Sequence, residues 1–438
     1  MRIVGGALGP SFALLWLVLA AGLASAATPT PTPTAARPPL GKPAVKCQAA
    51  IEKAALTFVK KKLQSLSQCV SSISKCIQST DGAAEQHTCL AKTGRACAGS
   101  GGRFERIGAE AAKLVASIRA ACEVKGLAPG DLRRSDGLGF DAVARECASV
   151  TTIAGIADCV AAQHACRAEQ IFEVQEPRAR ELIAKSTAAA GLSPPDLPCL
   201  HDLGDGGSLG LPKGAGELVL QCEATITKAG TRFVAAKSKS LAKCIDTIFA
   251  CVETKAGAER QTCLDGKATA ICAKEIGKIR SAASALAPSL DKKCLRDGGF
   301  YATGLAPLNG ANLAAPTVEC AGVGAGPGTY AGYQQCLAGQ HEARVDELVR
   351  LAVPRADELL ALVGCTLDGL ECVRSGIGRL VTFEPPPVQD LAAIGAPRLP
   401  DGRFFVFGTP DASLTVDTTL AGPEIGRASC RERVYVLV

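Results

Sequence analysis

The chain has 438 residues, a formal net charge of +6 and 21 cysteines, and only 4% of its residues are aromatic. Scarce aromatic side chains argue against a nucleic-acid surface built on base stacking and against a sugar-binding platform. The cysteine density lies below that of disulfide mini-proteins, so the sequence predicts apolar cores that disulfides reinforce rather than replace.

Residues 1–26 have the pattern of a secretory signal peptide. Arg2 gives a positive start, residues 12–21 are apolar, and Ala24-Ser25-Ala26 forms a small-residue cleavage site. A membrane anchor is the alternative, but the apolar stretch is short for a span. We therefore expect a periplasmic or secreted protein with no membrane span after signal cleavage. Residues 27–44 are rich in Thr and Pro, which predicts an extended tether or a disordered remnant.

Twenty of the cysteines form two consecutive sets of ten with similar spacing. A shift of 175 residues places four cysteines of the first set on four of the second, namely Cys47, Cys69, Cys76 and Cys97 on Cys222, Cys244, Cys251 and Cys272. This internal repeat predicts a cysteine-rich module at 45–200, a Gly-rich linker at 201–218 and a second module at 219–373.

The cysteine pattern ends after Cys372. Residues 374–402 form a Pro-rich linker, and 403–423 alternate like the first strands of a truncated β-rich segment. Residues 424–438 are interpreted as a probable artefact, because 424–434 resemble a translated sequencing adapter. Cys430 falls in this tail, and leaving it out gives each module the even number of cysteines that a disulfide framework needs.

Apolar residues at three- and four-residue steps predict a long helix at the start of each module. Cys69 and Cys76 then lie roughly 10.5 Å apart along one helix, further than the ~7 Å Cα limit of a disulfide. Each of these cysteines must therefore bond a cysteine on a neighbouring helix. If residues 85–97 form a helix antiparallel to the first, its two cysteines pair with Cys69 and Cys76 as an outer and an inner bridge. A third helix at 104–124 would return to the start of the first. The predicted pairs are Cys69–Cys97, Cys76–Cys89, Cys47–Cys122, Cys244–Cys272, Cys251–Cys263 and Cys222–Cys294.

The fold class expected is therefore all-α, as two tandem disulfide-stapled helical modules. The hairpin resembles that of twin-cysteine helix–coil–helix proteins, although the gaps between cysteines differ. The stretch Ile51-Glu52-Lys53-Ala54 and its counterpart Ile226-Thr227-Lys228-Ala229, each followed by Phe-Val and Cys-x6-Cys, resemble uncharacterised exported cysteine-rich helical repeats of Gram-negative bacteria. That resemblance spans roughly residues 45–373 and implies no known activity.

Chemical motifs are sparse. Gly206-x-Ser208-x-Gly210 matches a nucleophile elbow but lies in the linker, where we expect a flexible connector. His164 and His341 occupy corresponding positions and are interpreted as structural, with a metal or catalytic role as the alternative. His87 and His201 have no counterparts. The sequence thus predicts no catalytic residue, cofactor or metal ligand, and no enzyme.

The first helix of each module is basic. This predicts a solvated outer face or, alternatively, contact with an anionic envelope surface such as lipopolysaccharide. The residues are Lys53, Lys60, Lys61, Lys62, Lys228, Arg232, Lys237, Lys239 and Lys243.

The function expected is a non-catalytic extracytoplasmic structural or interaction module, whose partner is an envelope surface or another protein, without nucleic acid. The alternatives are a lipid, small-ligand or Cu(I)-binding bundle, or an accessory region of an enzyme.

Overall fold

The computed structural model describes residues 39–80, 82–204, 210–295, 299–368 and 372, and the part it describes is helical without a β-strand. The all-α expectation is confirmed there. The signal peptide, most of the tether, the Pro-rich linker at 374–402, the β-rich segment at 403–423 and the tail at 424–438 lie outside the described residues.

The first half is a helical hairpin followed by a second set of helices. Its long helix α1 is amphipathic and carries three cysteines on its buried side. The elements are α1 (Lys42–Gln78), α2 (Ala83–Ala98), α3 (Arg103–Glu123), α4 (Pro129–Arg133), the 3₁₀ helix η1 (Phe140–Glu146), α5 (Ile153–Gln175) and α6 (Ala179–Ala189).

The second half repeats this order with local changes. Here the helix that returns along the long helix α7 contains a π-helical segment, η2. The elements are α7 (Lys213–Thr254), α8 (Gly257–Thr262), η2 (Cys263–Ala268), α9 (Thr269–Ser284), α10 (Leu286–Cys294), the π-helix η3 (Tyr301–Leu305), α11 (Thr317–Ala321), α12 (Tyr330–Ala352) and α13 (Ala356–Ala361).

Two helices begin earlier than the sequence boundaries suggest. α1 starts at Lys42, inside the range assigned to the tether, because a proline such as Pro43 is well tolerated in the first turn of a helix. α7 starts at Lys213, inside the range assigned to the linker. Pro177 and Pro354 both lie between helices, which agrees with the helix break that proline predicts.

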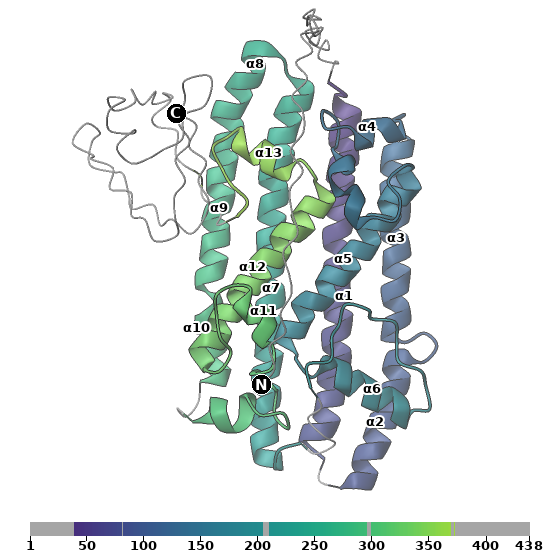
Figure 1. Cartoon of the computed structure of the whole chain (residues 1–438), viewed down its shortest axis with the longest axis vertical. Coiled ribbons are helices and arrows are strands. Elements are labelled where there is room, and N and C mark those ends of the chain that lie inside the picture. The colour runs from purple at the N-terminus through teal and green to yellow at the C-terminus, as the bar shows by residue number, and fades with distance from the viewer. Residues whose placement is uncertain (1–38, 81, 205–209, 296–298, 369–371, 373–438) are drawn as a thin grey trace, which may run out of the picture. The chain divides into compact units, whose positions relative to one another are not determined.

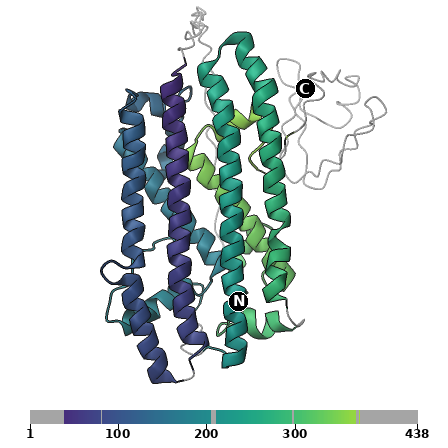
Figure 2. The same ribbon diagram turned by 180° about the vertical axis from the view of Figure 1, so that it is seen from behind.

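The helices α3, α1, α7 and α9 lie side by side in this order, as both views show (Figures 1 and 2). α5 and α12 pack across α1 and α7 on the side that faces the viewer in Figure 1. α1 and α7 are antiparallel, because Ser74 near the end of α1 donates to Glu223 near the start of α7 at 2.7 Å. The backbone N–H of Leu40 meets Glu253 at the other end.

Disulfides join the helices within each half. The structure contains the six pairs that helix geometry predicts, and it adds pairs that the sequence left open. The six are Cys47–Cys122, Cys69–Cys97, Cys76–Cys89, Cys222–Cys294, Cys244–Cys272 and Cys251–Cys263, and the added pairs are Cys147–Cys159, Cys166–Cys199 and Cys320–Cys336. Cys365 and Cys372 are also disulfide-bonded.

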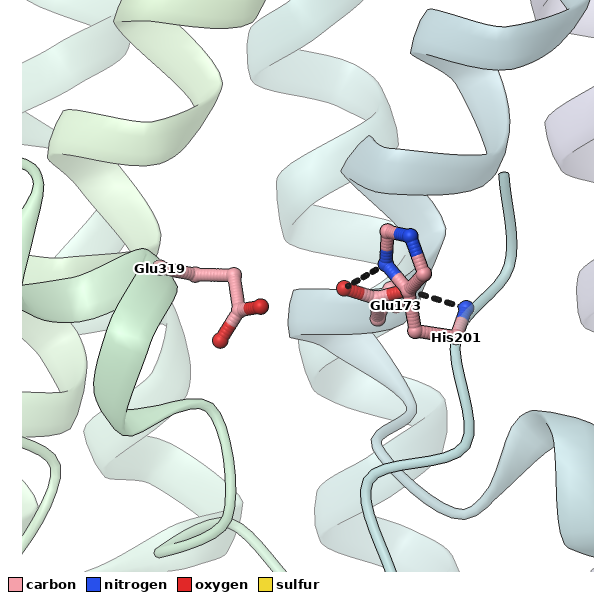
Figure 3. Close-up of side chains that lie close together, drawn as sticks. All are labelled: Glu173, His201 and Glu319. Atoms are coloured by element: carbon pink, nitrogen blue, oxygen red, sulfur yellow. Dashed lines mark hydrogen bonds and ion pairs between the residues drawn. The ribbon is translucent and has the colours of Figure 1, made fainter.

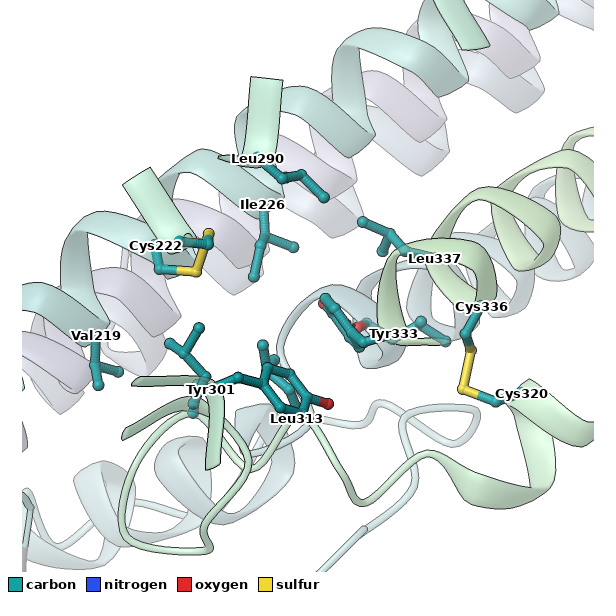
Figure 4. Packing of buried hydrophobic residues seen from close by; sticks show 14 residues of the cluster. Val219, Cys222, Ile226, Leu290, Tyr301, Leu313, Cys320, Tyr333, Cys336 and Leu337 are labelled. Carbon is teal, nitrogen blue, oxygen red and sulfur yellow. Dashed lines mark hydrogen bonds between the residues drawn. A yellow bond between two sulfur atoms is a disulfide. The ribbon is translucent and has the colours of Figure 1, made fainter. Parts of the chain in front are cut away.

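The two halves share a core. In the cluster of Figure 4, Val174 of α5 packs with second-half residues that include Tyr333 and Leu337. The buried Tyr333 hydroxyl donates to the carbonyl oxygen of Val174 at 3.0 Å. The described residues up to 368 accordingly belong to one compact unit.

A reciprocal pair of arginines also joins the halves. The guanidinium of Arg178 donates to the carbonyl oxygen of Gly310 in the second half at 2.9 Å. Arg355, which follows the corresponding proline, donates to the carbonyl oxygen of Gly137 in the first half at 2.7 Å. A buried charge needs such partners, so these contacts fix how the two halves meet.

The nested hairpin yields a first prediction. The Cys69–Cys97 bridge closes a separation of 28 residues, and a loop of that size is worth roughly 3 kcal/mol in the chain-entropy model. Replacing both cysteines by alanine should lower the free energy of unfolding by about this amount and leave the circular-dichroism helix signal largely unchanged. Non-reducing peptide mapping checks the pairing, and a Cys69–Cys89 peptide would contradict it.

Candidate binding groove

A groove of about 620 Å³ runs between α1 and α7. Its lining combines buried, half-buried and exposed residues of the two helices with one lysine of η2. The residues around it are Ala49, Glu52, Lys53, Leu56, Thr57, Val59, Lys60 and Leu63 of α1, and Thr231, Val234, Ala235, Ser238, Lys239, Ala242, Lys243, Asp246, Thr247 and Ala250 of α7, with Lys267.

The groove has an apolar floor and a basic rim. Side chains such as Leu56, Val59 and Val234 supply the floor, while the lysines lie at exposed positions. Lys243 is paired with Glu275 at 3.2 Å. The other rim lysines are Lys53, Lys60, Lys239 and Lys267. None of them has an ion pair with a described residue, so their charge is available to a ligand.

Two carboxyl groups face each other in the groove wall. Glu52 of α1 is only 4% exposed, and it shares a side-chain hydrogen bond with Asp246 of α7. Burial raises the pKa of Glu52 well above its usual value, and the neighbouring Asp246 raises it further. Burial also raises the pKa of Asp246 to about 6. Because two neighbouring ionised carboxylates repel each other, the pair favours a state in which it holds a proton between its members.

Buried polar atoms of the groove lack partners within the described structure. Oε2 of Glu52 and Oδ1 of Asp246 have no partner other than each other's carboxyl group, and Oγ of Ser238 has none. The contacts Ser74–Glu223 and Glu52–Asp246 set an antiparallel register in which Ser238 lies opposite Lys60. An unpaired buried hydroxyl is costly. The groove wall therefore contains one hydroxyl, that of Ser238, without a partner among the described residues.

The basic face predicted from the sequence divides into two kinds of lysine. Lys62 and Lys237 are 4% and 2% exposed, so the expectation of a solvated face is wrong for them. Lys62 pairs with Glu169 of α5, and Lys237 pairs with Asp346 of α12 at 2.9 Å. Lys53 lies nine residues, about two and a half turns, from Lys62, so it points to the opposite side of α1.

The buried pairs give a second prediction. Lys237→Met should lower the free energy of unfolding by about 3 kcal/mol, because Asp346 keeps its burial and loses its charge partner. Lys239→Met, two residues along the same helix at an exposed position, should change it by less than about 0.5 kcal/mol. Denaturant unfolding of both variants measures the difference, and equal effects would refute the buried ion pair.

The histidines at corresponding positions lie in the core. His164 and His341 have 0% exposure, and burial lowers their pKa values to about 4 and about 3. Nδ1 of His164 lies 2.8 Å from the carbonyl oxygen of Val160, and the Gln175 amide donates to Nε2 of His341 at 2.7 Å. Both rings are therefore neutral packing groups, which fits their structural interpretation.

A separate cluster brings His201 together with Glu173 of α5 and Glu319 of α11 (Figure 3). One potential ligand atom from each side chain lies within 4.8 Å of the others. Sequence reasoning missed this cluster, because its members are far apart in the chain and His201 has no counterpart in the second half. No disulfide could have indicated it, because Cys199 and Cys320, which lie next to His201 and Glu319, each bond within their own half.

Other candidates from the sequence are not brought together. The Gly206-x-Ser208 part of the elbow-like motif lies outside the described residues. His87 is exposed on α2, away from the groove residues. The module cysteines are disulfide-bonded, so they do not offer the free thiolates that Cu(I) storage needs.

Comparison with known proteins found no matching family model, curated protein or solved structure. Within the described ranges, none of the helices combines the length and apolar character needed to cross a bilayer. The disulfides indicate that the chain folds in an oxidising environment outside the cytoplasm.

The carboxyl pair gives a third prediction. Aspartate ionises near pH 4 in an unfolded chain, whereas the folded protein holds the Asp246 proton to a pH of about 6. The stability that this proton provides is complete below about pH 4 and is lost as the pH rises through 6. In the wild type, the free energy of unfolding should therefore fall between pH 4 and pH 8. In Asp246→Asn this fall should be smaller by on the order of 2 kcal/mol.

Denaturant unfolding across this pH range is the measurement, with the disulfides kept oxidised. Asp158→Asn is the matched control, because Asp158 is exposed. Its pH profile should follow that of the wild type. Parallel profiles for Asp246→Asn and the wild type would rule out the shared proton.

Proposed function

We propose that the protein is an exported, non-catalytic binding protein for single-chain anionic lipids, with the acyl chain held in the groove between α1 and α7. The observation that carries the proposal is the combination of an apolar floor with unpaired lysines along the rim. The proposal makes the lipid-binding alternative from the sequence analysis more specific. It assigns the exposed lysines of the basic face to the head group of the lipid.

The dimensions of the groove suit an extended chain. Its α1 wall reaches from Ala49 to Leu63, which corresponds to roughly 21 Å along the helix axis. A volume of about 620 Å³ lies within the range of small-molecule pockets. A long and narrow apolar surface favours an acyl chain over a compact ring system.

The charges favour an anionic head group. Lys60 and Lys239 lie on opposite walls near the middle of the groove, with the unpartnered hydroxyl of Ser238 between them in the helix register. A carboxylate or phosphate placed there would accept hydrogen bonds from all three groups. The shared proton of Glu52 and Asp246 reduces the negative charge on the same wall, which lessens repulsion.

A periplasmic or secreted location is part of this proposal, because lipids must cross an aqueous space to move between membranes.

Rival roles have less support. Copper storage is disfavoured by the disulfides. An accessory role beside an enzyme domain rests on residues after 372, which lie outside the described structure.

Binding of palmitate gives a fourth prediction. The double variant Lys60→Glu/Lys239→Glu should weaken palmitate binding about tenfold, since each exposed charge contact is worth about 0.2–1 kcal/mol. Lys61→Glu is the matched control, because Lys61 is exposed on the same turn but does not line the groove. Isothermal titration calorimetry measures both. Equal weakening by the control would show a general charge effect and overturn the site.

A blocking variant tests the groove itself. Ala235 lines the groove at an exposed position, so Ala235→Trp should fill it and abolish binding of palmitate without unfolding the helix. Ala224→Trp, exposed on the same helix outside the groove, should leave binding unchanged. Monopalmitoylglycerol, which has the same chain without the charge, should bind more weakly than palmitate to the wild type.

A further inference from the structure

We infer that Glu173, His201 and Glu319 form a binding site for a divalent transition metal that joins the two halves of the protein. Glu173 and His201 belong to the first half, and Glu319 belongs to α11 in the second. Figure 3 shows the Glu319 carboxylate directed toward the other two side chains. The inference is independent of the lipid-binding groove, which contains none of these residues.

The interatomic distances suit a tetrahedral ion. Zinc lies about 2.0–2.2 Å from nitrogen and oxygen ligands, so two ligands of a tetrahedral ion are separated by roughly 3.4 Å. Nδ1 of His201 lies 3.0 Å from Oε2 and 3.3 Å from Oε1 of Glu173. A metal ion can take the place of the hydrogen bond between them, and a small movement of Glu319 would complete a three-residue set.

Supporting contacts already orient Glu173. Oε2 of Glu173 accepts the backbone N–H of His201 at 2.6 Å, which holds the carboxylate beside the imidazole ring. Glu173 is 2% exposed, whereas the side chain of His201 is 57% exposed. The site thus combines a buried, fixed ligand with an edge that is open to solvent. Orienting contacts of this kind are typical of metal sites.

Disulfides fix the two ligands that lie outside α5. His201 follows Cys199, which is bonded to Cys166 on α5. Glu319 precedes Cys320, which is bonded to Cys336 on α12. Both ligands are therefore held close to rigid helices before an ion binds. Less conformational entropy is then lost when the ion binds.

The Glu319 carboxylate has no other role within the described residues. It has no hydrogen bond or ion pair there, yet it lies beside a second carboxylate of the same charge. A cation between the two carboxylates would replace repulsion by attraction. The imidazole in the set favours Zn²⁺ and similar ions over Ca²⁺ and Mg²⁺, which prefer oxygen ligands alone.

Titration of the full-length oxidised protein with Zn²⁺ tests the site, after alkylation of any free thiol. We expect one Zn²⁺ per chain, a rise in the thermal unfolding midpoint, and no displacement by millimolar Ca²⁺ or Mg²⁺. His201→Ala and Glu319→Gln should each weaken Zn²⁺ binding at least tenfold and abolish the rise in midpoint.

The control variants are His87→Ala and Glu342→Gln, which change exposed residues outside the cluster. Both should bind Zn²⁺ as the wild type does. Absence of Zn²⁺ binding by the folded wild type would overturn the site, as would equal binding by the wild type, His201→Ala and Glu319→Gln.

Discussion

The antiparallel contact of α1 with α7 is the constraint on which the rest of the structure depends. Each helix is the first arm of a disulfide-bonded hairpin, so placing the two helices together places both hairpins. The contact is also polar, since Ser74 meets Glu223 and Glu52 meets Asp246 within it. Buried polar groups must be paired, and pairs of this kind allow only one register between two long helices. The groove exists because this register leaves small and apolar residues along one face.

Sequence reasoning succeeded where the physics is local. Seven residues of helix separate Cys69 from Cys76, and this fixed distance leads to the nested pairs without knowledge of the fold. The contact of α1 with α7 was not predictable in the same way, because none of the disulfides described crosses from one half to the other. The misplacement of Lys62 and Lys237 has the same cause. Each is polar and was assigned to solvent, but its carboxylate partner lies more than 100 residues away in the sequence.

Positions related by the sequence shift have the same packing roles in both halves but differ at the candidate sites. The Lys62–Glu169 and Lys237–Asp346 pairs perform the same task in each half, as do Arg178 and Arg355 where the halves meet. The groove, in contrast, combines unlike residues. Glu52 corresponds to Thr227 after the shift of 175, so the carboxyl pair has no second copy.

The metal cluster is asymmetric for a similar reason. Shifting Glu173 by 177 residues, the spacing that relates His164 to His341, leads to Arg350, whose positive charge is paired with Asp357 and Asp368. The second-half position that corresponds to Glu173 therefore carries the opposite charge and offers no ligand for a cation. An ion held in the metal cluster would add to the links between the halves that Arg178 makes with Gly310 and Arg355 makes with Gly137. The two halves thus share buried ion pairs at corresponding positions, and they differ at the single positions on which both candidate sites depend.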